Sequence, residues 1–177
     1  MVTFIEKNDL PVVFHTGTSD IADPNEVLDL ADKYPNIRLC VAHCARFNKK
    51  FFERYNPYKY KNVFIDMAPF DLLFEMIKEN NVKHLPFKMD LSGKKEMMES
   101  LYHAFPHNIM WGSDVPWMNS YSLINGIKGK KILKYPEVIN TLFSVDEMIR
   151  KRIANKNVLR FIFGTEELEE RFNDKWK

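Results

Sequence analysis

Short apolar runs alternate with amphipathic segments through most of the chain. Four of the runs are rich in β-branched or aromatic residues and almost free of charge, which is typical of buried parallel strands; they cover residues 10–14, 37–43, 62–67 and 108–111. Apolar side chains recur at helical spacing between them, as at Leu73, Phe74 and Ile77. Helices are expected at 24–34, 70–80, 94–105, 135–143 and 145–154, from about Asn48, and after 157. This alternation predicts a parallel sheet with helices outside it.

Two architectures fit four strands with intervening helices: one half of an eight-stranded (β/α) barrel, or a small doubly wound sheet. In a barrel the chemical groups stand where strands end and their loops begin. His15, His43 and Asp114 each stand at the C-terminal end of a separate expected strand. A doubly wound sheet that binds nucleotides would need a glycine-rich phosphate loop, which we do not find. We therefore predict one domain, residues 1–177, with an α/β half-barrel fold.

The two histidines have similar positions but open roles. Alternation along the first strand places His15 with Val13 and opposite Val12, where it is either a metal ligand or a hydrogen-bonded core residue. Alternation along the second strand places His43 with Val41. A neutral imidazole there can bind a metal, hydrogen-bond an oxyanion or relay a proton, and the sequence does not choose among these roles.

The segment 111–117 is the most specific motif in the chain. Asp114 leaves a buried strand between Gly112, which clears space, and Pro116, which stops a helix. An aspartate in this position either accepts the proton of a metal-bound water while touching the metal, or closes the strand as an Asx turn. Asp66, at the end of the third strand, either lines the same pocket or lies in a solvated turn.

Four segments together resemble the amidohydrolase-related metal-dependent hydrolases, the group that includes aminocarboxymuconate semialdehyde decarboxylase. Residues 11–17 resemble the fifth barrel strand of this family with its metal histidine, and 39–43 the sixth strand with its catalytic histidine. Residues 111–117 are similar to the eighth-strand motif with its aspartate, and 157–161 to the Asn-x-x-Arg-Phe signature of the closing helix. The four segments follow the family's order.

The resemblance implies a role for each matching residue. His15 becomes a metal ligand, His43 an electrophilic or proton-shuttling residue, and Asp114 both a ligand and an acid–base group. Arg46 and Trp117 are expected to contact the substrate, although Arg46 is equally compatible with a surface position at a helix start. The family's first strand carries a His-x-His pair of ligands that has no counterpart here. The chain is therefore expected to correspond to strands five to eight and the closing helices.

The predicted function is a metal-dependent hydrolase that acts on a small carboxylate- or amide-type substrate. A nonoxidative decarboxylase of the same family and an inactive half-barrel that serves only for association are the alternatives. Zinc is the expected ion, with manganese or iron also compatible. Only two ligands are matched, whereas a catalytic zinc takes about three, so weak metal binding is expected of this chain alone. Open sheet edges would favour a homo-oligomer.

The composition of the chain indicates which partners and which cellular compartment to expect. Lys and Arg number 26 against 24 Asp and Glu, so the net charge of +2 gives no strong attraction to nucleic acid or to a membrane surface. No apolar run reaches the roughly 18 residues of a membrane helix, and we expect a cytoplasmic protein. The two cysteines, Cys40 and Cys44, are expected to be buried free thiols.

Overall fold

The computed structural model describes residues 1–17, 22–80, 85–114 and 135–166. Within them, four short strands form one parallel sheet in the order β1-β2-β3-β4. The strands are β1 (Val12–Phe14), β2 (Leu39–Val41), β3 (Val63–Asp66) and β4 (Ile109–Met110). Because consecutive strands are neighbours and all are parallel, their C-terminal ends meet at one edge of the sheet. This is the arrangement of four consecutive units of a (β/α)₈ barrel, and it differs from a doubly wound sheet, whose strand order reverses.

The helices lie close to the segments that the periodicity predicts. They are α1 (Val2–Lys7), α2 (Asn25–Lys33), α3 (Lys49–Arg54), α4 (Phe70–Asn80), α5 (Lys94–Ala104), α7 (Tyr135–Ser144), α8 (Glu147–Lys151) and α9 (Asn157–Phe163). A π-helical turn, η3 (Arg152–Lys156), joins α8 to α9, and a further turn, η2 (Ala42–Phe47), follows β2. The helix α1 was not predicted; none of its residues is fully buried, and Val2 and Ile5 pack only partly against the core.

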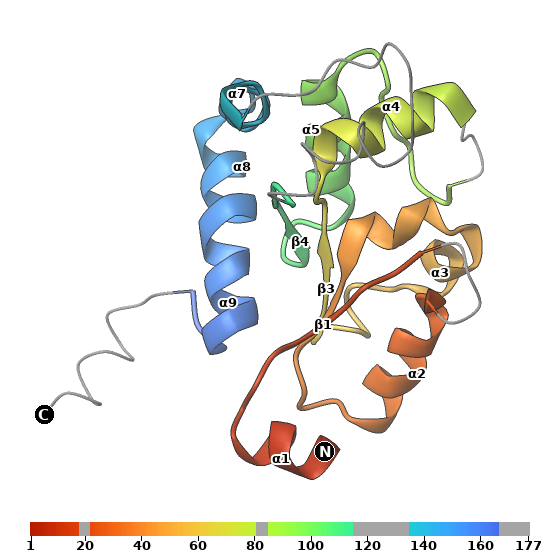
Figure 1. The fold of residues 1–177 in the computed structure, drawn as a ribbon, viewed down its shortest axis with the longest axis vertical. Coiled ribbons are helices and arrows are strands. Elements are labelled where there is room, and N and C mark those ends of the chain that lie inside the picture. Colours follow the sequence, from red (N-terminus) through yellow and green to blue (C-terminus); the bar gives the residue numbers. More distant parts are fainter. Residues whose placement is uncertain (18–21, 81–84, 115–134, 167–177) are drawn as a thin grey trace, which may run out of the picture.

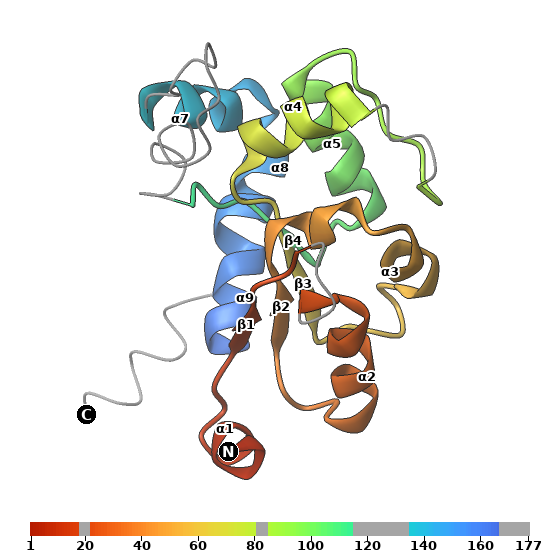
Figure 2. The ribbon, with the colours of Figure 1, turned by 45° about the vertical axis from the view of Figure 1, so that its right-hand side comes forward.

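One face of the sheet carries the main core. Leu39 is aligned with Val12 on one side and Val63 on the other, and these three side chains point towards the same helices. Apolar side chains of α2, α3, α4 and α5 cover this face, with the fully buried Leu28 and Phe51 among them. Figures 1 and 2 show α2 and α3 together on this side of the strands. Each crossover helix thus returns to the same face, as barrel geometry requires.

The opposite face, which would line the inside of a closed barrel, is only partly covered. Cys40, Phe64 and Met110 pack there against Phe161 of α9. The rings of Phe64 and Phe161 lie 5.3 Å apart, and Figures 1 and 2 show α8 and α9 across the sheet from α2 and α3. On the edge strand β1 nothing described covers Val13, which is 60% exposed. The inner face is therefore uncovered at β1 and covered at β3 and β4.

Two polar side chains, Asn157 and Arg38, connect the helix α9 to the sheet by hydrogen bonds. Asn157 is fully buried, and its Nδ2 donates to the carbonyl oxygens of Pro106 (3.0 Å) and Ile109 (2.7 Å), on either side of the start of β4. Arg38, just before β2, donates from Nε to the Phe161 carbonyl (2.7 Å) and from Nη2 to the Asp9 carbonyl (2.7 Å). It also forms an ion pair with the Asp9 carboxylate. Arg38 thus ties the segment before β1 to the end of α9 at the N-terminal edge of the sheet.

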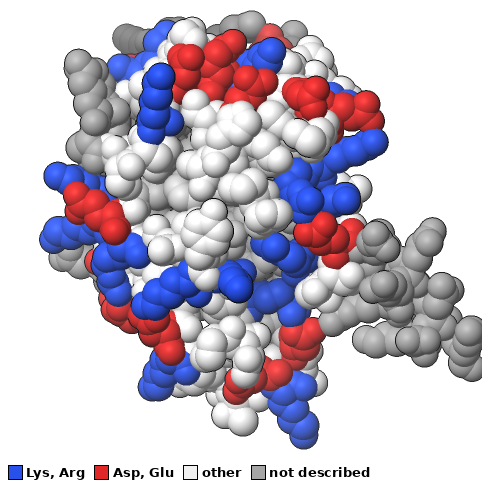
Figure 3. Space-filling view, turned by 180° about the vertical axis from the view of Figure 1, so that it is seen from behind, with Lys and Arg blue, Asp and Glu red and all other residues white. Residues whose placement is uncertain are grey.

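The surface mixes both signs of charge. Figure 3 shows Lys and Arg side chains interspersed with Asp and Glu around an uncharged central area, seen from behind. Ion pairs such as Arg54 with Asp29 and Lys59 with Asp32 join opposite charges on neighbouring elements. Among the residues described, no helix has both the length and the apolar character to cross a membrane.

The role of Asn157 can be tested by comparison with a neighbour. Asn157→Ala removes two hydrogen bonds and leaves two backbone carbonyls without their donor, so the free energy of unfolding should fall by about 2 kcal/mol or more. The matched control is Asn155→Ala, an exposed asparagine two residues earlier, which should change stability by less than about 0.5 kcal/mol. Urea denaturation followed by circular dichroism measures both. Equal effects would mean that Asn157 does not anchor the closing helix.

Candidate active site

Two imidazoles are in direct contact at the C-terminal edge of the sheet. Nε2 of His43 lies 3.1 Å from Nδ1 of His15, and the ring centroids are 4.8 Å apart in an edge-to-face arrangement. His43 is buried and His15, which directly follows β1, is exposed. The other nitrogen of His43, Nδ1, lies 2.6 Å from the carbonyl oxygen of Ala68. The structure therefore joins the two predicted histidines, with one end of the pair buried and the other open to solvent.

These contacts assign the protons of the neutral pair. A carbonyl oxygen can only accept, so Nδ1 of His43 carries a proton and donates it to Ala68. Nε2 of neutral His43 is then an acceptor, and Nδ1 of His15 must donate to it. The remaining nitrogen, Nε2 of His15, keeps its lone pair. Because His15 is exposed, this lone pair is the one offered to a proton, a metal ion or a substrate.

The position of His43 differs from the sequence expectation. The predicted strand 37–43 and its alternation put His43 on the face of Val41, but β2 already ends at Val41. From His43 to Phe47 the chain then makes a left-handed turn, with φ between 48° and 57° at five consecutive residues. The prediction was wrong because alternation holds only inside a strand. The turn rotates His43 towards the loop after β3 and towards His15.

Burial offsets the strain of this turn. None of its residues is glycine, and left-handed backbone costs an L-residue roughly 1–2 kcal/mol. Cys44 and Ala45 are fully buried, and Phe47 stacks on Phe52 with ring centroids 6.3 Å apart. Thr16, also buried, donates from Oγ1 to the Ala42 carbonyl at 2.6 Å and so ties the loop after β1 to the start of the turn. The turn is thus held by packing on both sides.

A carboxylate lies behind the imidazole pair. Oδ1 of Asp66, the last residue of β3, accepts a hydrogen bond from the Ala68 amide at 2.9 Å. Burial raises the pKa of Asp66 from 3.8 to about 6; the Ala68 amide opposes this shift and the negative charge of Asp114 adds to it. Asp66 therefore belongs to the same cluster as His43 and Asp114. Its burial contradicts the interpretation as a solvated turn residue, and its place in a substrate pocket stays a prediction.

Gly112 is required by the space that this cluster occupies. A Cβ atom at position 112 would lie 2.6 Å from Oδ1 of Asp66 and 2.9 Å from Cβ of Ala68. Both distances are shorter than real side chains tolerate, and the Ala68 Cβ has little freedom to move. The glycine predicted to clear space beside Asp114 thus clears it for Asp66.

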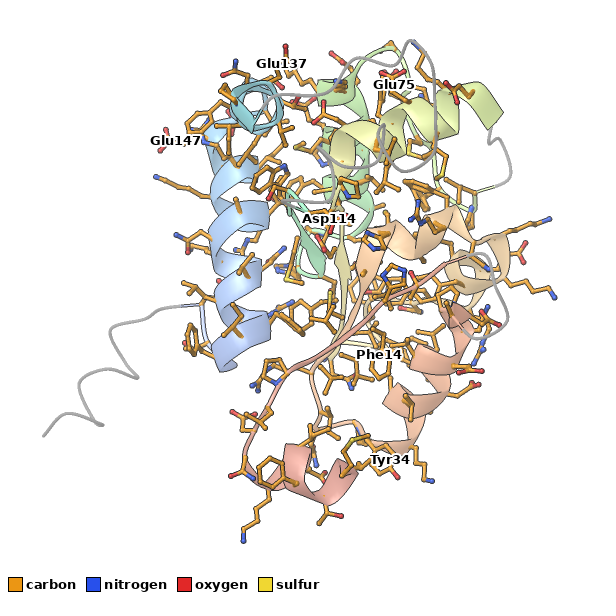
Figure 4. All side chains as sticks on the ribbon, in the orientation of Figure 1. Phe14, Tyr34, Glu75, Asp114, Glu137 and Glu147 are labelled. Carbon is orange, nitrogen blue, oxygen red and sulfur yellow. The ribbon has the colours of Figure 1, made fainter. Side chains whose placement is uncertain are left out.

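The other predicted site residues have fewer described contacts. Asp114 lies beyond β4 with a left-handed φ of 56°, and Figure 4 shows it near the middle of the molecule, away from the labelled Glu137 and Glu147. Arg46 is part of the left-handed turn and is partly buried, so it is not the surface arginine of a helix start. Trp117 lies outside the described residues. The substrate roles of Arg46 and Trp117 stay predictions.

The buried thiols are not part of the reactive group. Cys40 and Cys44 are free and buried, as predicted. Burial raises the pKa of both thiols above their ordinary value, and the nearby Asp66 charge adds to this. A thiol with a raised pKa is a poor nucleophile, because the thiolate is the reactive form.

The donor set suits zinc in its chemistry but not in its arrangement. Two imidazoles and two carboxylates, from His15, His43, Asp66 and Asp114, are the ligand types that zinc prefers. Across the described ranges, however, no three His, Cys, Asp or Glu side chains come close enough together to hold a metal ion. His15 and His43 are bonded to one another instead. The described residues do not form a preassembled metal centre, and the ligand roles of His15 and Asp114 stay predictions.

The raised pKa of Asp66 predicts how stability depends on pH. The folded state holds a proton on this carboxyl up to about pH 6, whereas the unfolded chain releases it near pH 4. As pH rises from 4 to 7, wild type should therefore lose stability relative to Asp66→Asn, by at most about 1.4 kcal/mol per pH unit. Denaturant titrations of both proteins across this range measure the difference.

Asp90→Asn is the control for this experiment, because hydrogen bonds from Ser92 lower the pKa of Asp90 instead of raising it. Wild type should not lose stability relative to this variant as pH rises from 4 to 7. Parallel stability curves for wild type and Asp66→Asn would contradict the assignment of Asp66 as a buried carboxyl in the cluster.

Comparison with known proteins agrees with the fold. The model of the amidohydrolase family matches residues 1–163. No curated protein matches the chain, and no solved structure does. The family match spans all four strands, the His15–His43 pair, Asp66 and Asp114, and most of the closing helices. The chain, with its partial barrel of four parallel strands, therefore belongs to the amidohydrolase family.

Proposed function

We propose that this chain carries the acid–base half of an amidohydrolase site that hydrolyses a small amide substrate bearing a carboxylate. The observation that carries the proposal is the ordered imidazole pair. The bonds from His15 to His43 and from His43 to the Ala68 carbonyl leave one lone pair, on Nε2 of His15, directed away from both partners. An acid–base site needs a nitrogen that can accept a proton while the hydrogen bonds of its neighbours fix where the other protons lie.

The roles of the neighbouring groups follow from their surroundings. When Nε2 of His15 takes a proton, Nδ1 of His15 still donates to His43, so the positive charge lies beside a buried acceptor. The carboxyl of Asp66, with a pKa of about 6, and that of Asp114 lie in the same cluster and favour this charge. Arg46 lies in the same left-handed turn as His43, and we assign its guanidinium group to the substrate carboxylate.

Members of the amidohydrolase family usually bind divalent metal ions, and we propose zinc for this protein. Because the described residues bring no three donors together, Zn²⁺ should bind this chain weakly, with a Kd above about 1 µM. Calorimetric titration of the chain with Zn²⁺ measures the affinity, and His15→Gln should abolish what binding there is. Stoichiometric binding well below 1 µM would show that the chain holds a complete metal site by itself.

Activity assays separate hydrolysis from decarboxylation. With excess Zn²⁺, the chain should release free amine from N-acyl amino acids and no CO₂ from aromatic carboxylic acids. Asp114→Asn should lower kcat/KM about 100-fold or more, because it removes the acid–base carboxylate. Asp90→Asn, a change of the same chemistry at an exposed position, should leave kcat/KM unchanged. CO₂ release without amine release would favour the nonoxidative decarboxylase instead.

A second candidate function is association without catalysis. The edge strand β1 presents the 60% exposed Val13, and no described strand pairs with its outer side. Unpaired strand edges favour pairing with another chain, and a homo-oligomer of this protein is the partner we propose. If the zinc titration gives no heat and both activities are absent, this candidate is favoured over the hydrolase. A cytoplasmic location remains our proposal for either function.

A further inference from the structure

Three hydrogen bonds connect Asp66 to the exposed nitrogen of His15. Oδ1 of Asp66 accepts from the Ala68 amide at 2.9 Å. The Ala68 carbonyl accepts from Nδ1 of His43 at 2.6 Å, and Nε2 of His43 accepts from Nδ1 of His15 at 3.1 Å. Ala68 is therefore held on its amide side and holds His43 on its carbonyl side.

We propose that Asp66 is a positioning residue of the imidazole pair. By holding Ala68, it keeps the Ala68 carbonyl at Nδ1 of His43 and so fixes the tautomer of both histidines. The unprotonated nitrogen of the pair is then always Nε2 of His15. This inference deepens the proposed function and rests on it for its catalytic meaning, whereas the tautomers themselves do not depend on any activity.

The packing around Asp66 supports a specific role for this carboxylate. Its Oδ1 fills the space over Gly112, where a side chain would collide both with it and with Cβ of Ala68. Met67, between Asp66 and Ala68, is fully buried and donates from its amide to the Met110 carbonyl at 2.9 Å. The backbone hydrogen bond of Met67 fixes the position of the loop relative to β4. The bond from the Ala68 amide to Asp66 then fixes the direction in which the Ala68 carbonyl points.

An aspartate with the same local bond but no such contacts provides a matched control. Asp90 accepts from the amide of Ser92, two residues later, also at 2.9 Å, and it is exposed. Its bond has the geometry of an ordinary Asx turn. Any effect of removing the turn itself should therefore appear at both positions, and an effect on the histidines only at Asp66.

The test reads tautomers directly from imidazole ¹⁵N chemical shifts at a fixed pH of about 8.5, where free imidazole is neutral. Nitrogen-15 spectra of the whole chain distinguish protonated from unprotonated ring nitrogens, and single His→Gln substitutions assign the five histidines. In wild type, both His15 and His43 should be protonated at Nδ1 and unprotonated at Nε2. A wild-type His43 protonated at Nε2 would overturn the proposal without any variant.

Four variants then test whether Asp66 sets the tautomer of His43. Asp66→Ala should give His43 a measurable Nε2–H population, whereas Asp66→Asn, which keeps an acceptor oxygen for Ala68, should retain the wild-type tautomers. Gly112→Ala should resemble Asp66→Ala, because its methyl group displaces Oδ1. Asp90→Ala should change nothing. Unchanged His43 shifts in folded Asp66→Ala or folded Gly112→Ala would show that Asp66 does not position the pair.

Kinetics distinguish this inference from the proposed function. If the chain is a hydrolase, Asp66→Ala should lower kcat about 10- to 100-fold with little change in KM, and Asp66→Asn should recover most of the loss. Tautomer changes without any hydrolase activity in wild type would uphold the positioning role and contradict the hydrolase. Hydrolase activity with unaltered tautomers in Asp66→Ala would do the reverse.

Discussion

Five consecutive residues with positive φ, His43 to Phe47, follow β2, and the arrangement of the whole site depends on them. At roughly 1–2 kcal/mol for each residue, such a turn has a cost comparable to the net stability of a small domain. It persists because Cys44 and Ala45 lie in the core and would have to leave it for the chain to relax. The hydrophobic core thus maintains an unfavourable backbone conformation whose effect is to bring His43 under His15.

Sequence periodicity was sufficient for the elements whose side chains repeat regularly. The helix at residues 70–80 has the predicted bounds, and the four strands are found where their apolar runs lie, each shorter than its run. The runs are longer than the strands because apolar residues continue into buried turns, as they do after Val41. A left-handed turn of non-glycine residues has no local sequence signal, so alternation was extended into it and placed His43 on the wrong face.

The site was predictable residue by residue but not as a set of contacts. Strand-end positions identified His15, His43 and Asp114, and the structure brings the two histidines into contact. The Ala68 carbonyl could not be found in this way, since a backbone acceptor leaves no trace in residue type. The sequence indicated that Gly112 clears space, but it related this space to Asp114. The group that occupies the space is Asp66, which comes from another strand. Contacts between strands depend on register, which the four runs alone did not specify.

The fold also shows how a partial barrel covers its own sheet. A sheet of four parallel strands needs cover on both faces. In a closed barrel the inner face is covered by the opposite strands, and here Phe161 of α9 covers part of it. Val13 at β1 has no such cover. The uncovered part of the inner face therefore lies next to His15, so that any chain pairing with β1 would also border the open side of the imidazole pair.

Arg38 joins two segments of the chain that lie far apart in the sequence. Its guanidinium group binds Asp9 near the start of the chain and the carbonyls of Phe161 and Ile162 near the end of α9. All of these partners lie at the N-terminal edge of the sheet, opposite the imidazole pair. The segment before β1 and the end of α9 are consequently neighbours in space, although about 150 residues separate them in the sequence.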